Sequence, residues 1–415
     1  MASGYDTKTR GLAWLHRCLA DERAEYGLAF NPLRDAFQKA PEDAYAELRR
    51  RSPVHYSRLL DCWIVTRYEE VAHLLRENDV FRSSPHTTTQ ALVDPYATLD
   101  PDRPSLFMLD PPAHTRLRGA VREAFGPEAV RRLTPHLEEC VRDVVQRLGR
   151  PGDRVDLVPR FAGAIPLRVL DLVTGLDMHG ADDVTGWVSD IVLGLEPIAT
   201  AQTAQRALTS YRALGKYLDE RRARPAREGS LHWSLLRSVR AGRLTDAEAR
   251  QLLMFLVLAG TKTVSDFLAS AARHLSALPP RAPERRHVDS ALVDDLIARV
   301  SPVQIVARTA AVPTVLCGRR IRAGQRILLV LASANRDLAA GAREDGGETG
   351  TGRARRAVAF GGGIHRCLGA HLARLEGRYA LSYLLERFPE VRLTGATPSR
   401  RCVTLRSWDS VIVHL

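Results

Sequence analysis

The residues whose type and spacing best support chemistry lie in one glycine-rich segment, 359–369, with the sequence AFGGGIHRCLG. Its glycines permit unusual backbone angles and let the main chain approach a flat molecule closely. Cys367 comes directly before a stretch with helical spacing, where backbone N–H groups stabilise a thiolate over a thiol. A thiolate presented in this way can bind haem iron as its fifth ligand and donate electron density that favours O–O bond cleavage.

The same segment resembles the FxxGxHxCxG haem-binding loop of the cytochrome P450 family, in particular of its soluble bacterial members. The resemblance covers roughly residues 30–415 and leaves residues 1–29 as an N-terminal extension. It implies a single-domain fold, mainly α with minor β, in which haem b lies between a long central helix and the cysteine loop. Cys367 then binds the iron. The other matching loop residues, expected to contact the cofactor, are Phe360, Gly363, His365 and Gly369.

Charged residues elsewhere in the chain suit an anionic group. His114 and Arg118 are four residues apart and therefore share one face of a predicted helix. The resemblance implies that this pair binds one haem propionate, that Arg308 binds the other, and that His365 also reaches a propionate. Each residue alone is more often a surface or capping residue. Together, in this order around the cysteine loop, they predict an anion cradle.

The longest helical pattern, 245–278, contains the run LLMFLVLAG, which is apolar on all sides and predicts a helix buried through the centre of the protein. The run is too short and too close to charges for a membrane span. The small Ala259-Gly260 pair leaves room beside this helix. Thr263 can donate to the carbonyl of Ala259 and widen the helix into an oxygen-binding groove. These three residues and Lys262 are the predicted catalytic residues.

Lys262 departs from the family pattern, which places an acid directly before the threonine. In the resembling enzymes, that acid and the threonine relay protons to dioxygen. The chain has only four lysines, and one of them stands here. We therefore expect dioxygen to be coupled poorly to hydroxylation, with adaptation to another oxidative or rearranging step. The alternative is that Lys262 turns away to a helix carbonyl or a carboxylate.

The family's ExxR ion pair is also altered. Its glutamate position is Asp295 and its arginine position is Ala298, whereas Arg299 is four residues from Asp295 and can pair with it. The aromatic and proline landmarks of the following meander are missing from 338–357. Removing one partner of a buried ion pair costs about 3–5 kcal/mol, while replacing the whole set can be neutral. The sequence therefore favours a different packing of side chains on the cysteine side of the haem, rather than a broken ion pair.

Periodicity supplies the remaining elements. Residues 44–52 and 68–78 have helical spacing, and 53–66 alternate as a β-hairpin. The segment 331–337 (LASANRD) matches the strand-to-turn region that precedes the family's meander. Residues 82–108 have the composition of a loop. Further helices are predicted over 111–148, 166–176, 182–195 and 207–224, and strands over 308–315, 319–335 and 402–415.

The composition limits the function classes. The chain has 415 residues and a net charge of +12, carried almost entirely by arginines that are scattered among carboxylates, which does not indicate nucleic-acid binding. An acidic protein partner accounts better for the charge, and Arg116, Arg122, Arg366 and Arg374 are candidates for its docking face. Six cysteines without CxxC spacing and a polar start without an apolar run predict a reduced, cytoplasmic protein with no membrane segment.

Two classes of function remain. The first is a haem-thiolate oxidoreductase of bacterial natural-product metabolism that monooxygenates a medium-sized organic substrate. No flavin or nicotinamide fingerprint is present, so the electrons are expected to come from another protein. The family resemblance implies that this source is ferredoxin with ferredoxin reductase. The second class is a catalytically degenerate partner or activator of another biosynthetic enzyme. Haem-dependent rearrangement or peroxide-driven oxidation lies between the two.

Overall fold

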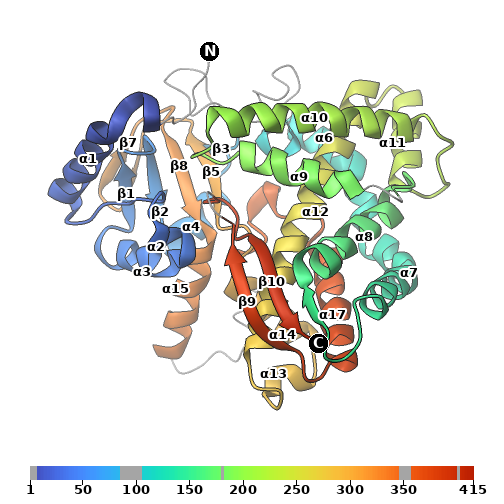
Figure 1. The fold of residues 1–415 in the computed structure, drawn as a ribbon. Helices are drawn as coiled ribbons and strands as arrows, with labels where there is room; N and C mark the ends of the chain where they lie inside the picture. The colour runs from blue at the N-terminus through green and yellow to red at the C-terminus, as the bar shows by residue number, and fades with distance from the viewer. Residues whose placement is uncertain (1–6, 85–104, 179–181, 345–356, 400–401) are drawn as a thin grey trace.

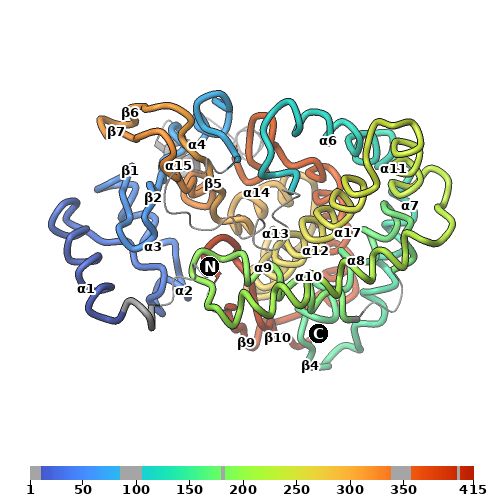
Figure 2. The backbone as a smooth tube through the Cα atoms, turned by 90° about the horizontal axis from the view of Figure 1, so that it is seen from above, coloured from blue at the N-terminus to red at the C-terminus, as the bar shows by residue number. Residues whose placement is uncertain are grey.

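The computed structural model describes residues 7–84, 105–178, 182–344, 357–399 and 402–415. The five-stranded sheet lies with the first helices on one side, and a larger group of helices lies with the C-terminal strands on the other (Figures 1 and 2). The N-terminal helices are α1 (Thr7–Tyr26), α2 (Asp35–Lys39), α3 (Pro41–Arg51), α4 (Tyr68–Leu74), α6 (Ala113–Arg122) and α7 (Pro127–Gln146). The others are α8 (Ala164–Thr174), α9 (Asp182–Gly194), α10 (Ala201–Arg222), α11 (Leu231–Arg240), α12 (Asp246–Ala277), α13 (Pro283–Arg286), α14 (Ser290–Val300), α15 (Leu331–Glu344) and α17 (Ala370–Arg387).

The main sheet has five strands in the order β1-β2-β8-β5-β3. Strands β2 and β8 pair in parallel and read as continuous apolar runs because both of their faces are buried. Strand β5 pairs antiparallel with β8 and places Arg308 opposite Ile327, which fixes the position of this arginine. The strands are β1 (Val54–Ser57), β2 (Cys62–Val65), β3 (Phe81–Arg82), β5 (Ile305–Ala310) and β8 (Arg326–Val330).

The described residues also form two smaller sheets. The order β4-β10-β9 joins the C-terminal strands to a short strand after α7, and β6 pairs with β7 as a hairpin. The segment 402–408, directly before and at the start of β10, connects this sheet to the centre of the molecule. The strands are β4 (Arg154–Asp156), β6 (Thr314–Leu316), β7 (Arg319–Ile321), β9 (Arg392–Pro398) and β10 (Trp408–His414).

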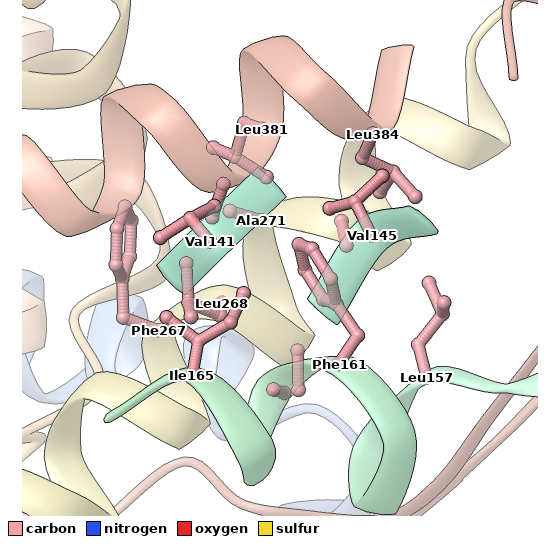
Figure 3. Packing of buried hydrophobic residues seen from close by; sticks show 14 of the residues in the cluster. Val141, Val145, Leu157, Phe161, Ile165, Phe267, Leu268, Ala271, Leu381 and Leu384 are labelled. Atoms are coloured by element: carbon pink, nitrogen blue, oxygen red, sulfur yellow. The ribbon is translucent and has the colours of Figure 1, made fainter. Parts of the chain in front are cut away.

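Helix α12 runs through the middle of the helical side, as its all-round apolar run predicts. It begins in a capping box, in which Thr245 and Glu248 satisfy the first backbone donors of the helix. Its C-terminal half packs into a core shared with α7, α8 and α17, where Phe267 and Leu268 meet side chains such as Leu381 (Figure 3). In the described part of the chain, α12 alone is long and apolar enough to cross a membrane. However, 72% of its most apolar window is buried within the protein, as in a core helix.

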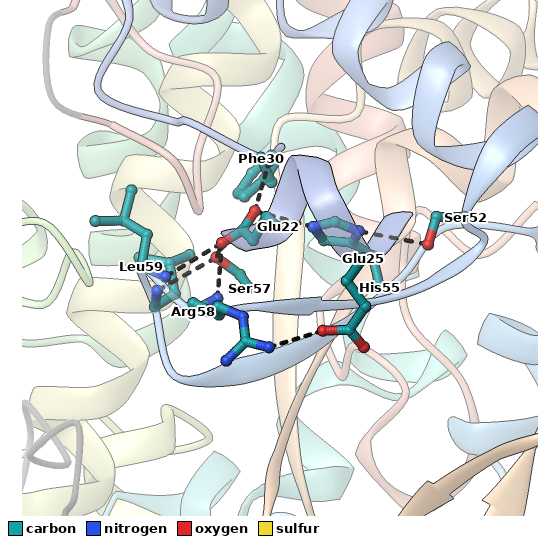
Figure 4. A network of polar contacts seen from close by, with 9 residues as sticks. Glu22, Glu25, Phe30, Ser52, His55, Ser57, Arg58 and Leu59 are labelled. Atoms are coloured by element: carbon teal, nitrogen blue, oxygen red, sulfur yellow. Dashed lines mark hydrogen bonds and ion pairs between the residues drawn. The ribbon is translucent and has the colours of Figure 1, made fainter. Parts of the chain in front are cut away.

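Helix α1 is attached to the β1–β2 hairpin through a buried carboxylate (Figure 4). Glu22 is 0% exposed and accepts from the backbone N–H groups of Phe30 at 2.8 Å and Arg58 at 2.7 Å. Its Oε2 also lies 3.0 Å from Nε2 of His55. Because a buried carboxylate without partners is costly, these contacts bind residues 22–30 firmly to the sheet.

Two expectations about elements were wrong. The segment 331–337 starts α15 rather than continuing a strand, because its alanines, leucine and arginine favour a helix once β8 ends at Val330. The pattern over 111–148 forms two helices, because Gly126 is extended and Pro127 starts α7 at its first turn. The predicted hairpin over 53–66 is confirmed. Most of the predicted 82–108 loop and of the 338–357 meander region lies outside the described residues.

Candidate haem-binding site

The cysteine loop is a tight turn that packs on the end of α4. The Cys367 N–H donates to the carbonyl of Phe360 at 2.9 Å, which closes the loop over its glycines. Gly361 and Gly363 have φ values of +69° and +60°. A Cβ on Gly363 would lie 2.3 Å from the carbonyl oxygen of Leu75. Glycine is therefore required at 363 both for its backbone angle and for this close approach.

Cys367 is accessible to solvent and lies two residues before Gly369, the N-cap of α17. The protein atoms packed around the thiol raise its pKa, and a hydrogen bond from the Gly369 N–H and the charges of Arg118, Arg374 and Arg366 act in the opposite direction. The helix start alone was expected to favour the thiolate. In the structure, desolvation acts against that effect, and a cation bound to the sulfur would favour the thiolate.

The predicted anion cradle assembles beside the loop. The rings of His114 on α6 and His365 in the loop lie 4.3 Å apart between centroids. Among the residues that the structure describes, neither ring nitrogen of His114 has a hydrogen-bond partner, and the same holds for Nε2 of His365 and Nε of Arg308. Arg308 is 5% exposed. Arg118 donates to the carbonyl of Arg366 at 2.6 Å and so ties α6 to the cysteine loop.

The cradle has an excess of positive charge. Burial and the neighbouring Arg308 and His114 lower the pKa of His365 to about 3, while burial and Arg118 lower the pKa of His114. Burial also lowers the pKa of Arg308 to about 10, so the guanidinium stays charged at neutral pH. Asp110, the nearby carboxylate, already accepts from Ser83 and Ser84. Buried donors without partners beside a fixed cation fit a bound carboxylate, such as a haem propionate.

The predicted oxygen-binding stretch of α12 has the expected threonine contact. Thr263 Oγ1 donates to the carbonyl of Ala259 at 2.7 Å, which confirms that hydrogen bond. A Cβ on Gly260 would meet only Leu170, at 3.5 Å, so the helix surface is open at this point. Lys262 forms an ion pair with Asp266 and donates to Ser407 Oγ at 2.8 Å. Its side chain is therefore directed to a carboxylate, which was the alternative considered for this residue.

The cysteine side of the fold is held by contacts other than an ExxR pair. Asp295 and Arg299 form an ion pair at 3.1 Å, as predicted, but the arginine side chain is 51% exposed. Asn335 on α15 donates to Ser301 Oγ at 3.0 Å and accepts from the N–H of Val358 at 2.8 Å. This amide links the end of α14 to the start of the cysteine loop. A second link is the ion pair between Arg374 and Asp294 at 2.5 Å.

Sequence reasoning missed Asp266, Ser407, Glu196 and Asn335. Asp266 had a detectable signal, because it lies four residues after Lys262 and these two are the only charged residues between positions 252 and 272. Glu196, in the α9–α10 connection, had none. Glu196 is 4% exposed, and its carboxylate accepts from the N–H of Val403 at 2.8 Å and from Thr404 Oγ1 at 2.6 Å. These hydrogen bonds hold the α9–α10 connection against the segment 402–408.

A cysteine presented by a glycine loop, beside buried cationic donors, is typical of a haem-thiolate protein. The chain is 32% identical over 391 residues to cytochrome P450 107B1 of Saccharopolyspora erythraea, covering 90% of this chain and 93% of that relative. It is 32% identical to a vitamin D(3) 25-hydroxylase of Pseudonocardia autotrophica, covering 86% and 88%. These relationships place the chain in the cytochrome P450 family.

Solved structures agree. The fold matches epothilone D-bound cytochrome P450epoK with a TM-score of 0.79 and 25% identity, covering 94% of this chain and 99% of the other. It matches CalO2 with a TM-score of 0.78 and 25% identity, covering 93% and 98%. No protein-family model matches the chain. The protein is thus a cytochrome P450-type oxidoreductase with haem b as its cofactor, and the donors of the cradle fit that group.

The close approach at Gly363 gives a first prediction. Gly363→Ala is expected to lose haem and to unfold at a clearly lower temperature, because its Cβ would collide with the Leu75 carbonyl. Gly361→Ala is the matched control, since it has a similar φ and its nearest atom is 3.8 Å away. The control carries only the left-handed backbone cost of about 1–2 kcal/mol. Thermal unfolding and haem content measure both variants, and equal losses would contradict the role of the contact.

The cradle gives a second prediction. Arg308→Ala is expected to weaken hemin binding by the apoprotein about 10- to 100-fold, the loss of one hydrogen bond to a charged group. Arg118→Ala/Arg308→Ala should bind more weakly still, because Arg118 also holds the cysteine loop. Arg116→Ala is the control on the same helix, since Arg116 pairs with Glu248. A hemin titration that gave the double variant wild-type affinity would place the cradle elsewhere.

Glu196 gives a prediction of pH dependence. Burial raises the pKa of Glu196 to about 7 from 4.5, against the hydrogen bonds from Thr404 and Val403. The pKa of Glu196 is thus higher in the folded protein than in the unfolded chain. Its contribution to the free energy of unfolding is therefore complete below pH 4.5 and is lost as the pH rises through 7. As the pH rises from 5 to 8, the free energy of unfolding measured in urea should fall less for Glu196→Gln than for wild type, by on the order of 3 kcal/mol. Parallel pH profiles would show that the carboxyl does not titrate in this range.

Proposed function

We propose that this protein is a haem-thiolate monooxygenase of bacterial natural-product metabolism. The proposal is carried by the cluster of buried donors beside the loop that presents Cys367, which have no partner in the described part of the chain. Bound haem supplies the activation of dioxygen. In this assignment Cys367 binds the iron through its sulfur, and Phe360, Gly363 and Gly369 shape the loop around the cofactor. His114, Arg118, Arg308 and His365 hold the propionates.

The names of several relatives support the substrate class. A polyketide biosynthesis cytochrome P450 of Bacillus subtilis is 28% identical, and a mycinamicin IV hydroxylase/epoxidase of Micromonospora griseorubida is 29% identical. A 20-oxo-5-O-mycaminosyltylactone 23-monooxygenase of Streptomyces fradiae is 31% identical. In this chain, Phe107 stacks on Phe255 of α12 with ring centroids 5.9 Å apart. Phe255 lies one helical turn before Ala259, and we expect these apolar rings to contact a medium-sized organic substrate such as a macrolide.

Electrons are proposed to come from an acidic ferredoxin and its reductase in the cytoplasm. Of the four arginines considered for a docking face, Arg116 pairs with Glu248 and Arg374 with Asp294. Arg122 and Arg366 are exposed, and Arg366 is adjacent to Cys367. Exposed arginines beside the thiolate loop favour electrostatic steering of an acidic donor.

Reconstitution tests this function. The purified protein is combined with ferredoxin, ferredoxin reductase, NADPH and a panel of macrolide and polyketide precursors under ¹⁸O₂. The expected result is a hydroxylated or epoxidised product with one ¹⁸O atom, which requires NADPH. A colourless protein that does not take up hemin, or a product whose oxygen comes from water, would overturn the proposal.

Peroxide-driven oxidation or rearrangement is the second candidate, and one observation favours it. Lys262 replaces the acid before Thr263 and is engaged by Asp266 and Ser407. A reaction that starts from hydrogen peroxide needs neither external electrons nor a proton relay to dioxygen. The same substrate panel with hydrogen peroxide in place of NADPH and ferredoxin distinguishes the two. Faster product formation with peroxide would select this candidate. A protein that bound no haem and instead altered another enzyme's rate would select the partner role.

A further inference from the structure

A pocket of about 260 Å³ opens between α6, the short turn η1 (Leu106–Met108) and the first turns of α12. Packed elements rarely leave an unfilled space much larger than a water molecule, so a pocket of this size needs an explanation. Six of its ten lining residues are apolar, namely Leu106, Leu109, Ala113, Leu117, Ala247 and Leu252. An apolar hollow holds water poorly and gains free energy when an apolar molecule replaces that water.

The charged residues of the pocket are paired with each other. Arg116 and Glu248 form an ion pair, and Arg116 Nη1 also donates to the carbonyl of Arg243 at 3.3 Å. The hydrogen bond from Arg116 lowers the pKa of Glu248 to about 2, so the carboxylate is ionised at neutral pH and the two charges cancel. Gln251 accepts from the hydroxyl of Tyr211 at 3.1 Å. The lining therefore favours a neutral apolar ligand over an ion.

The pocket is separate from the predicted oxygen-binding stretch of α12. Leu252 lies seven residues before Ala259, and Glu248 lies eleven residues before it, which are distances of roughly 10 and 16 Å along the helix. Phe255, whose ring stacks on Phe107, lies between Leu252 and Ala259 on α12. A small molecule that fills the pocket is therefore a different molecule from the one that is oxidised.

Helix α6 connects the pocket with the anion cradle. Ala113 and Leu117 line the pocket, and the residues that follow them, His114 and Arg118, belong to the cradle. Successive residues of a helix point about 100° apart, so α6 presents these two pairs on neighbouring faces. A molecule that supports α6 from the pocket side therefore also restrains the two side chains on the cradle side.

We propose that this pocket is a second binding site, for a neutral apolar molecule of roughly ten non-hydrogen atoms, and that its occupancy strengthens haem retention through α6. The size follows from the volume of the pocket, and the neutrality follows from its paired charges. The proposal uses the cradle but not the monooxygenase function proposed above. By linkage, the molecule in the pocket and the haem each favour binding of the other to the same extent.

Indole is a suitable probe for the site, because it is neutral, bicyclic and close to this size. Equilibrium dialysis of the haem-loaded protein counts the bound indole, and the haem absorption spectrum of the same samples reports indole beside the iron. We expect one molecule that binds with a Kd on the order of 0.1–1 mM and leaves the haem spectrum unchanged. If all bound indole followed the spectral change, it would occupy only the haem side, and the proposal would be wrong.

Two substitutions fill the pocket from opposite walls. Ala247→Phe on α12 and Ala113→Leu on α6 are each expected to weaken the spectrally silent binding by about tenfold or more, because their side chains take the space of the ligand. Ala241→Phe is the matched control, since Ala241 is exposed and is not among the lining residues. Silent binding that is as tight in both filled variants as in wild type would overturn the proposal.

The transfer of hemin from the protein to apomyoglobin tests the coupling through α6. Saturating indole is expected to slow this transfer about threefold in wild type and to have no effect in Ala247→Phe, whose pocket is already filled. Equal rates with and without indole in wild type would overturn the proposal. Equal slowing by indole in wild type and Ala247→Phe would also overturn it, because the effect would then come from the haem side.

Discussion

Replacing Cys367 by serine is expected to abolish the thiolate signature in the spectrum of the reduced carbon monoxide complex. The sulfur is the only atom of the side chain that can donate electron density strongly to iron, and a hydroxyl is a much weaker donor. The loop should still fold, because its closing hydrogen bond uses the backbone N–H of residue 367 and the Phe360 carbonyl. The variant is therefore expected to take up hemin but to show an altered spectrum and to lose oxygenation of substrate.

Cys140→Ser is the control for this experiment. Cys140 is a partly buried free cysteine of α7, outside the cysteine loop, and burial raises the pKa of its thiol to about 11. It should keep the wild-type spectrum. Identical spectra for wild type and Cys367→Ser would show that the iron ligand is another residue, and the assignment of the loop would be wrong.

The strongest sequence signals were local and chemical, and the structure agrees with them. Glycines around Cys367 predict a close backbone approach, and Gly363 indeed lies against Leu75. The apolar run within 245–278 predicts a buried central helix because no exposed helix is apolar on all sides, and α12 is that helix. Such signals succeed because each depends on one short stretch of chain.

Signals that depend on distant partners failed or were absent. The segment 331–337 resembles a strand, yet Asn335 must face both Ser301 and Val358, and a helix places it there. Glu196 gives no sequence signal, because its partners are backbone N–H groups about 200 residues away, at 403 and 404. Backbone donors have no residue type by which a sequence can identify them. The direction of the Lys262 side chain likewise depends on Ser407.

Lys262→Asp, which brings the sequence closer to the family pattern, is expected to destabilise the protein rather than to improve hydroxylation. The substitution removes the cation that pairs with Asp266, which is 3% exposed, and adds a second carboxylate beside it. Loss of one partner of a buried pair costs about 3–5 kcal/mol, and repulsion between the two acids adds to this. The midpoint of urea unfolding should therefore fall, and it should fall further at pH 8 than at pH 5, where protonation relieves the repulsion.

The double variant Lys262→Asp/Asp266→Asn separates stability from chemistry. An asparagine amide at 266 can donate to the new carboxylate and carries no charge, so most of the lost stability should return. This variant is the proper test of whether an acid before Thr263 raises the hydroxylated product formed per NADPH. If Lys262→Asp alone were as stable as wild type, the ion pair seen with Asp266 would not be formed in solution. If instead the double variant were stable but produced no more product than wild type, the lysine would be no obstacle to oxygenation. Its role in the groove would then be confined to the contacts it makes with Asp266 and Ser407.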